Sequence, residues 1–273
     1  MTTAPYESLA ELEEAASALD VERVNVAGLP LARMTRDEQA RYMVESWRAG
    51  RAAATTPEPK IGVSINGHVI SLYYSSPEFK AAVDQVDFLD ADGMSVVFAS
   101  RLFGRGGLPE RVATTDFFHD VARRAETAGM SFYFLGADED QCRIATEQVR
   151  KMYPNLRIAG RRHGYFTEDE EAAICEEIVA AGTDLLWVGR GSPSQEQFAV
   201  RNRDRLKGVA WIKTCGGLFD FLSGKAQRAP QWMQDAGLEF VYRAWREPRR
   251  LLWRYITTSP HALYLMAKNS RNI

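Results

Sequence analysis

The chain has 273 residues, of which 45% are hydrophobic and 26% charged, and its formal net charge at pH 7 is −2. That length and apolar content are enough to bury a full core without help from disulfides or metals. Cys142, Cys175 and Cys215 show neither CxxC nor zinc-ligand spacing, which excludes a disulfide or zinc scaffold and favours a reducing compartment. No apolar run reaches the roughly 18 residues that a membrane-spanning helix needs.

The N-terminal segment is acidic. Five carboxylates between Glu7 and Asp20 precede any basic side chain, which is unlike a secretory signal or a transit peptide. We therefore expect residues 1–22 to form an extension outside the core of a soluble or peripheral cytoplasmic protein.

The first half of the chain mixes strands, helices and loops. Its best-defined start is a capping box, in which Thr35 stands three residues before Glu38. The predicted elements are a strand at 24–31 with a turn at Gly28, a helix from Thr35 to about Gly50, a loop at 51–60, a strand at 61–65, a helix at 77–86, a strand and turn at 88–93, a helix at 94–102, a glycine-rich loop at 104–112 and a helix that Thr115 caps and that ends near Ala128.

The second half alternates more regularly. It predicts strands at 131–135, 156–159, 185–188 and 209–214, separated by helices at 138–153, 167–181 and 195–205, the second of these with a capping box at Thr167 and Glu170. Strands spaced by helices of this length predict parallel βαβ units and an open, doubly wound α/β sheet.

In such a sheet, ligands bind outside the carboxyl ends of the strands. The predicted strand ends carry Asn66, Asp92, Gly136, Gly160, Gly189 and Gly216, so we expect these residues to share one edge. The glycines form neither the dinucleotide fingerprint nor a P-loop, which disfavours NAD-dependent and ATP-dependent enzymes but leaves another mode of nucleotide binding open.

The turn after the strand at 185–188 is the best candidate for a phosphate site. Gly189 and Gly191 break the apolar run, and Pro193 is well placed to open a helix. A helix N-terminus there would aim backbone N–H groups at an anion, with Gln195 facing the same ligand. The alternative is an ordinary turn of an α/β protein.

The C-terminal segment is basic and aromatic. Residues 240–273 carry a net charge of +6 against −8 for the rest of the chain, and Pro248 predicts a break between two short helices. This asymmetry favours an anionic partner, which could be a phosphorylated substrate, an acidic membrane surface or nucleic acid. The alternative is a helix that docks its aromatic side chains on the core and leaves its arginines in water.

An ordered set of short motifs indicates that the chain resembles a known protein family. It comprises 64-SIN-66, 91-ADG-93, 110-ERV-112, 133-YFLG-136, 164-GYF-166, 191-GSPSQE-196, 216-GGLFDFLSG-224, 228-RAP-230 and 247-EPRRL-251. With these motifs, the stretch from Val24 to Pro260 resembles the WecG/TagA/CpsF glycosyltransferase family, glycosyltransferase family 26.

The resemblance implies a Rossmann-like open, mostly parallel sheet at 23–227 and a helical appendage at 228–273 that contacts the membrane and the active site. It also implies an inverting transferase that needs neither metal nor cofactor. Such an enzyme moves a sugar from a UDP-sugar donor to a polyprenyl-pyrophosphate-linked sugar acceptor in bacterial surface polysaccharide synthesis. We therefore expect a protein that is peripherally associated with the inner face of the cytoplasmic membrane and has no nucleic-acid partner. A homo-oligomer is possible, and the oligomeric state stays open.

The resemblance also implies the site residues. Asp92 is the expected base, in agreement with the single base that an inverting transfer needs, although it could instead cap the helix that starts at Met94. The expected substrate-binding residues are Ser64, Asn66, Gly136, Gly189, Arg190, Gly191, Gln195 and Gly217, and those expected at the lipid pyrophosphate or membrane are Arg243, Arg246, Arg249, Arg250 and Arg254. Because the resemblance implies a reaction without a metal ion, helix N-termini and arginines must stabilise the leaving UDP.

Three departures from the family pattern stand out. Ser64 replaces a usual threonine, Ser194 replaces a usual lysine, and Thr214-Cys215 replaces a common Gly-Val. Arg190 could supply the missing charge or point to solvent. The donated sugar stays undetermined, and a catalytically inactive nucleotide-sugar-binding regulatory or scaffold protein of the same fold remains the alternative function.

Overall fold

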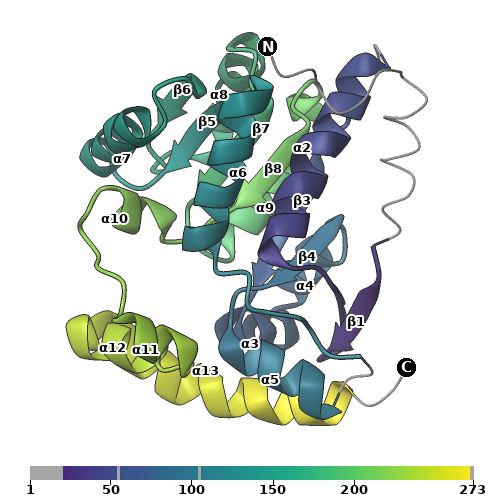
Figure 1. Ribbon diagram of the computed structural model, residues 1–273, viewed down its shortest axis with the longest axis vertical. Coiled ribbons are helices and arrows are strands. Elements are labelled where there is room, and N and C mark those ends of the chain that lie inside the picture. The colour runs from purple at the N-terminus through teal and green to yellow at the C-terminus, as the bar shows by residue number, and fades with distance from the viewer. Residues whose placement is uncertain (1–20, 54–55, 104–105, 271–273) are drawn as a thin grey trace.

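The computed structural model describes residues 21–53, 56–103 and 106–270, so most of the predicted acidic extension lies outside the described residues. A six-stranded parallel sheet in the order β4-β3-β8-β7-β5-β6 runs through the molecule (Figure 1). Its strands are β3 (Lys60–Ile65), β4 (Phe88–Ala91), β5 (Ser131–Gly136), β6 (Arg157–Arg162), β7 (Leu185–Gly189) and β8 (Trp211–Thr214). The predicted open parallel α/β sheet is confirmed.

Helices cover both faces of the sheet. One face packs on α2 (Arg36–Ala52), α6 (Thr114–Ala128), α7 (Glu139–Met152) and the short α10 (Leu218–Leu222). The other packs on α3 (Gly67–Ser75), α4 (Pro77–Val83), α5 (Met94–Phe103), α8 (Glu171–Ala180) and α9 (Ser194–Arg201), with short 3-10 turns η1 (Glu168–Glu170) and η2 (Asp204–Leu206) beside α8 and α9. Five of the strands between these layers are almost fully buried, as their apolar runs require, whereas the edge strand β6 is only partly buried.

Local signals place most of these elements correctly. The capping boxes at Thr35 and Glu38 and at Thr167 and Glu170 are both formed. Thr115, however, is not a cap, because α6 begins at Thr114 and its N-cap is Ala113, two residues before Thr115. The Thr115 hydroxyl instead accepts a hydrogen bond from Arg228.

Two strand predictions need correction. The segment at 24–31 is not one strand but an antiparallel hairpin of β1 (Arg23–Val26) and β2 (Leu29–Ala32), because both turn residues, Ala27 and Gly28, have positive φ. Gly160 lies inside β6 rather than at its end. A Cβ on Gly160 would stand 2.4 Å from the Tyr133 ring. Its lack of a side chain therefore serves strand packing and not the carboxyl edge.

The C-terminal appendage consists of α11 (Gln231–Asp235), α12 (Glu239–Arg246) and α13 (Pro248–Asn269). The predicted break near Pro248 is present, because α12 ends at Arg246 and α13 begins at Pro248, but the second helix is not short and has 22 residues. α13 lies across the end of the molecule against α3 and α5 (Figure 1), where Ala262, Leu265 and Met266 are buried. Among the described residues no helix combines the length and apolar character of a membrane span.

Candidate active site

Two adjoining cavities open at the carboxyl edge of the sheet. One, of about 390 Å³, is lined by polar groups that follow β3, β7 and β8. The other, of about 530 Å³, lies between the core and helices α12 and α13 and is lined largely by apolar side chains. The residues common to both linings are Asn66, His68, Asp92, Thr114, Cys215, Gly217, Arg243 and Arg254. Two compartments of opposite polarity therefore meet at one carboxylate.

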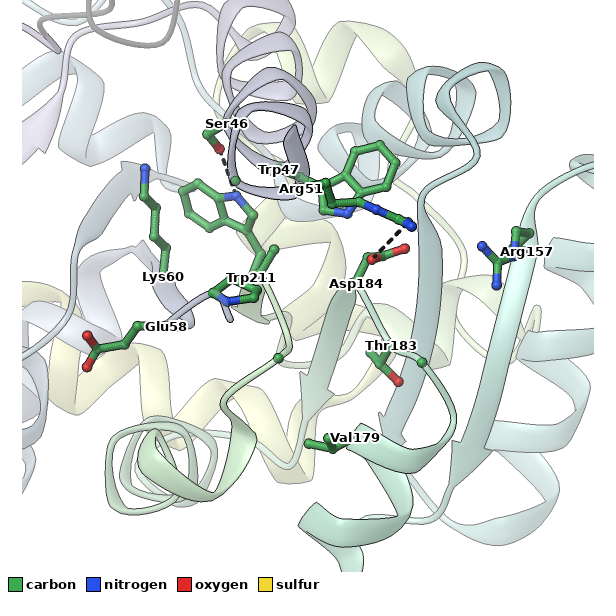
Figure 2. A pocket seen from close by; sticks show the side chains of 15 residues that line it. Ser46, Trp47, Arg51, Glu58, Lys60, Arg157, Val179, Thr183, Asp184 and Trp211 are labelled. Carbon is green, nitrogen blue, oxygen red and sulfur yellow. Dashed lines mark hydrogen bonds and ion pairs between the residues drawn. The ribbon is translucent and has the colours of Figure 1, made fainter. Parts of the chain in front are cut away.

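A third cavity, of about 660 Å³, lies at the opposite edge, where the strands begin (Figure 2). Its wall contains Trp47, Lys60 and Trp211, and its carboxylate, Asp184, already accepts hydrogen bonds from Ser131. Because ligands of open parallel sheets bind at the carboxyl ends of the strands, we place the candidate site with the two smaller cavities.

Asp92 follows β4 directly, and its backbone N–H donates to the carbonyl of Ile65 at the end of β3 (2.9 Å). Its carboxylate accepts from the backbone N–H of Thr114 on α6 (3.4 Å), whereas α5 begins with a hydrogen bond from Val96 N–H to the carbonyl of Gly93. The carboxylate thus turns toward the cavities, and the hydrogen bond that it makes is not a cap on α5.

Burial raises the pKa of Asp92 to about 6. The positive charge of Arg111 opposes this rise, while the negative charges of Asp90 and Glu239 add to it. A carboxylate with a pKa just below neutral is mostly ionised at pH 7 and still basic enough to take a proton in a transition state.

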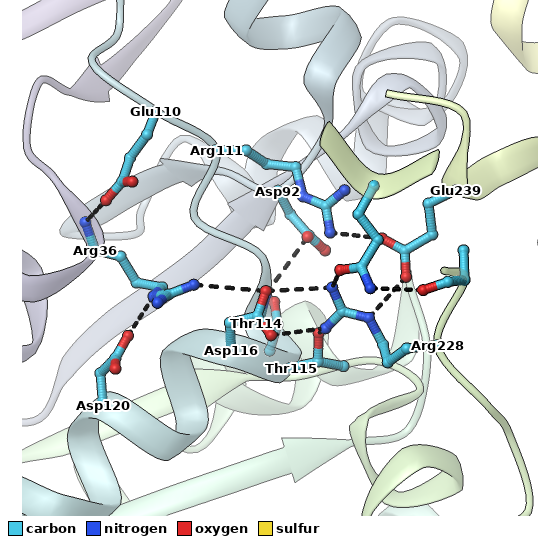
Figure 3. Close-up of polar contacts among 12 residues, drawn as sticks. Arg36, Asp92, Glu110, Arg111, Thr114, Thr115, Asp116, Asp120, Arg228 and Glu239 are labelled. Carbon is cyan, nitrogen blue, oxygen red and sulfur yellow. Dashed lines mark hydrogen bonds and ion pairs between the residues drawn. The ribbon is translucent and has the colours of Figure 1, made fainter. Parts of the chain in front are cut away.

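Arg111 belongs to a cluster that joins the appendage to the core (Figure 3). Its Nη2 donates to Glu239 at the start of α12 (2.6 Å), and Arg228 reaches both Glu239 (2.8 Å) and Asp116 on α6 (2.9 Å). No sequence pattern assigns a role to Arg111, Arg228 or Glu239. The motifs 110-ERV-112 and 228-RAP-230 mark the first two, and no motif marks Glu239.

Several of the predicted substrate-binding residues line the polar cavity. The residues that do so are Ser64, Asn66, Gly189, Arg190, Gly191, Gln195 and Gly217. Gly136 is not among the lining residues and pairs with Gly189 on the adjacent strand. A Cβ at Gly136 or Gly189 would stand 2.7 Å or 2.5 Å from the Phe219 ring. These two glycines therefore let the Phe219 ring pack across the strand ends.

Gln195 and Arg190 are held by other protein groups. The Gln195 side chain accepts from the Gly216 N–H (3.0 Å) and donates to Glu196 (2.8 Å), so it ties the loops after β7 and β8 together. Arg190 donates to the carbonyls of Gly164 (2.9 Å) and Phe166 (3.1 Å) and stacks on the Phe166 ring at 3.9 Å. Its guanidinium therefore fastens the loop at 163–166 instead of replacing the missing lysine or pointing to solvent.

The tail arginines divide into two groups. Arg243 and Arg254 line both cavities, whereas Arg246 and Arg249 are exposed. Nothing is described of the Arg250 side chain.

His68, beside Arg254, also lines both cavities, and no sequence motif pointed to it. Burial, with the charge of Arg254, lowers its pKa, so the imidazole is neutral at pH 7. Its Nδ1 is buried and makes no hydrogen bond among the residues that the structure describes.

The fold and the site define a Rossmann-like enzyme with a polar and an apolar cavity that meet at one carboxylate. The family described as "Glycosyl transferase WecG/TagA/CpsF family" matches residues 24–273, and the chain belongs to it. The chain is 30% identical over 220 residues to the N-acetylglucosaminyldiphosphoundecaprenol N-acetyl-beta-D-mannosaminyltransferase of Bacillus spizizenii, a match that covers 81% of this chain and 80% of that protein. The chain is therefore a glycosyltransferase.

Proposed function

We propose that this glycosyltransferase moves a sugar from a UDP-sugar to a polyprenyl-pyrophosphate-linked sugar, with inversion, during synthesis of a bacterial surface polysaccharide. The observation that carries the proposal is the position of Asp92, where the polar and the apolar cavities meet. The name of the Bacillus spizizenii relative describes transfer of N-acetylmannosamine to a diphosphoundecaprenol-linked N-acetylglucosamine, so this pair of substrates is the first to test.

In the proposed reaction Asp92 is the base. Its carboxylate takes the proton of the acceptor hydroxyl while that oxygen forms a bond to the anomeric carbon, and the bond from that carbon to UDP breaks on the opposite face. This single displacement inverts the anomeric centre. Arg243 and Arg254, which line both cavities, stabilise the negative charge that develops on the leaving diphosphate.

The polar cavity suits the nucleotide-sugar. The turn after β7 and the start of α9 contribute backbone N–H groups beside the diphosphate. Tyr165 is 76% exposed at the wall of this cavity, and an aromatic ring there can stack on a nucleobase. Arg190 acts through this loop, because it holds the carbonyls on both sides of Tyr165.

The apolar cavity suits the lipid-linked acceptor. Phe98, Leu238 and Leu263 line it and remain 38–56% exposed, and the outer surface of the appendage adds Trp245 and Trp253 at 75% and 71% exposure. Exposed aromatic side chains beside exposed arginines bind the interface of an acidic membrane. We place residues 228–273 at the inner face of the cytoplasmic membrane, with the acceptor reaching Asp92 through the apolar cavity.

The test is release of UDP from a panel of UDP-sugars, with a polyprenyl-pyrophosphate-linked N-acetylglucosamine acceptor in detergent. We expect acceptor-dependent turnover with one donor, loss of turnover in Asp92→Asn, and opposite anomeric configurations of donor and product by NMR. Arg254→Ala should lower kcat at least tenfold, whereas Arg246→Ala, an exposed matched control, should keep kcat in detergent. Nucleotide binding without turnover on any donor and acceptor would favour the regulatory alternative.

A further inference from the structure

A buried ion pair lies beneath the candidate site. Lys213 on β8 and Asp90 on β4 are each 1% exposed, and Lys213 Nζ is 2.6 Å from Asp90 Oδ2. The strand β3 separates β8 from β4, so the lysine stem has to cross it. It does so over Gly62, where a Cβ would stand 3.2 Å from Lys213 Cδ. The glycine therefore makes room for the pair.

The ammonium group also donates to the Ser64 hydroxyl at 2.8 Å, and Ser64 shares a hydrogen bond of 3.0 Å with the Thr114 hydroxyl. An ammonium group has no acceptor, so Ser64 must be the acceptor in the first of these bonds. The two hydroxyls carry two protons, and the bond between them uses one. The other is left to donate into the polar cavity, because neither hydroxyl has a further partner among the described residues.

The same backbone position connects this chain of hydrogen bonds to the base. The N–H of Thr114 donates to Asp92, while its hydroxyl is the last member of the chain that starts at Lys213. A hydroxyl that accepts from a cation is a stronger donor, since hydrogen bonds in a chain polarise one another. The pair thus favours a donor, not an acceptor, on the cavity wall beside the catalytic carboxylate.

Stability does not explain the pair. Removing both charges from water costs several kcal/mol per ion, and apolar replacements of such pairs are often neutral or stabilising. We propose that Lys213 and Asp90 are positioning residues, which hold the hydroxyls of Ser64 and Thr114 so that one of them donates to an oxygen of the nucleotide-sugar. This inference rests on the proposed function, because it requires a nucleotide-sugar in the polar cavity.

A double-mutant cycle tests it. The first arm is Ser64→Ala, the second is Lys213→Met combined with Asp90→Leu, and the third combines all three changes. Each is measured by UDP-sugar affinity in calorimetry and by kcat and KM with the lipid-linked acceptor, while thermal unfolding checks the fold. If Lys213→Met with Asp90→Leu does not fold, Lys213→Gln with Asp90→Asn takes its place in the same cycle.

If the pair acts through Ser64, each of the first two arms weakens UDP-sugar binding and turnover roughly tenfold, and the triple variant is no worse than either. A roughly hundredfold loss in the triple variant, or an unchanged second arm, would show that the pair does not act through Ser64 and would overturn the inference. Absence of both UDP-sugar binding and turnover in the wild type would instead overturn the proposed function. Calorimetry measures UDP-sugar affinity without an acceptor, so the cycle can be completed even if the chosen lipid-linked sugar is not the true acceptor.

Discussion

Asp92→Asn should stabilise the free enzyme while it abolishes turnover. Burial raises the pKa of this carboxyl from 3.8 to about 6, so the folded chain disfavours its ionised form. The protonated carboxyl therefore favours the folded state. This contribution to the free energy of unfolding is complete below pH 3.8 and is lost as the pH rises through about 6. Asparagine keeps an oxygen that can accept from Thr114 and carries no charge at any pH.

The size of the effect follows from the two pKa values. Each unit corresponds to 1.36 kcal/mol, which sets an upper limit of about 3 kcal/mol at pH 8. Because solvent still reaches part of this carboxylate, we expect about 2 kcal/mol. For a chain of this size that gain raises the unfolding midpoint by about 4 °C. The gain should shrink to roughly half at pH 5.

The measurement is thermal unfolding by circular dichroism at pH 8 and pH 5, without ligands. Asp204→Asn is the matched control, because the exposed Asp204 carboxylate is paired with Lys207, which lowers its pKa. Its loss should therefore destabilise the protein slightly at pH 8, opposite in sign to Asp92→Asn. An Asp92→Asn variant that is no more stable than the wild type at pH 8 would refute the argument that burial penalises this charge.

Further predictions address the base, the loop, the appendage and the glycines. A plot of kcat/KM against pH should rise with an apparent pKa near 6 and then level, because the base must be ionised; a flat profile from pH 5 to pH 8 would contradict that role. Arg190→Met should weaken UDP binding roughly tenfold in calorimetry by releasing the loop around Tyr165. Unchanged affinity would contradict a role of that loop in UDP binding. Glu239→Gln should make the appendage more sensitive to limited proteolysis, since it removes the charge between Arg111 and Arg228; wild-type cleavage would contradict this. Gly189→Ala should cost about 1–3 kcal/mol by crowding Phe219, whereas Gly50→Ala, inside α2 with open space around it, should stabilise by about 0.5–1 kcal/mol in urea unfolding.

The sequence predicts the sheet and its functional edge because both depend on local patterns. Apolar runs alternate with helical segments, and in a parallel sheet all the carboxyl ends meet at one edge, so Asn66 and Asp92 could be placed together without a structure. The helix α3 was not predicted, because its nine residues form a short apolar run with no clear helical period.

The contacts that escaped prediction join residues far apart in the chain. Lys213 and Asp90 are 123 residues apart, and a single lysine in a strand gives no sign of a partner two strands away. The role of Arg190 depends on how the loop at 163–166 returns to β7, which no local spacing specifies. Long-range pairs of this kind decide which polar groups of the site are free for a substrate.

The appendage is best understood from where it is fixed. Glu239 binds the start of α12 to Arg111 and Arg228, and the end of α13 is buried on α3 and α5, where Ser270 accepts from the Ala27 N–H (2.8 Å). Between these two anchors the chain directs Arg243 and Arg254 toward the cavities and exposes apolar side chains outward. The same segment lines the apolar cavity and carries that exposed surface. In the proposed reaction it therefore both contacts the membrane and admits the lipid-linked acceptor. The ion cluster at Glu239 connects the appendage to the proposed base, since Arg111 is held by Glu239 and its positive charge lowers the pKa of Asp92.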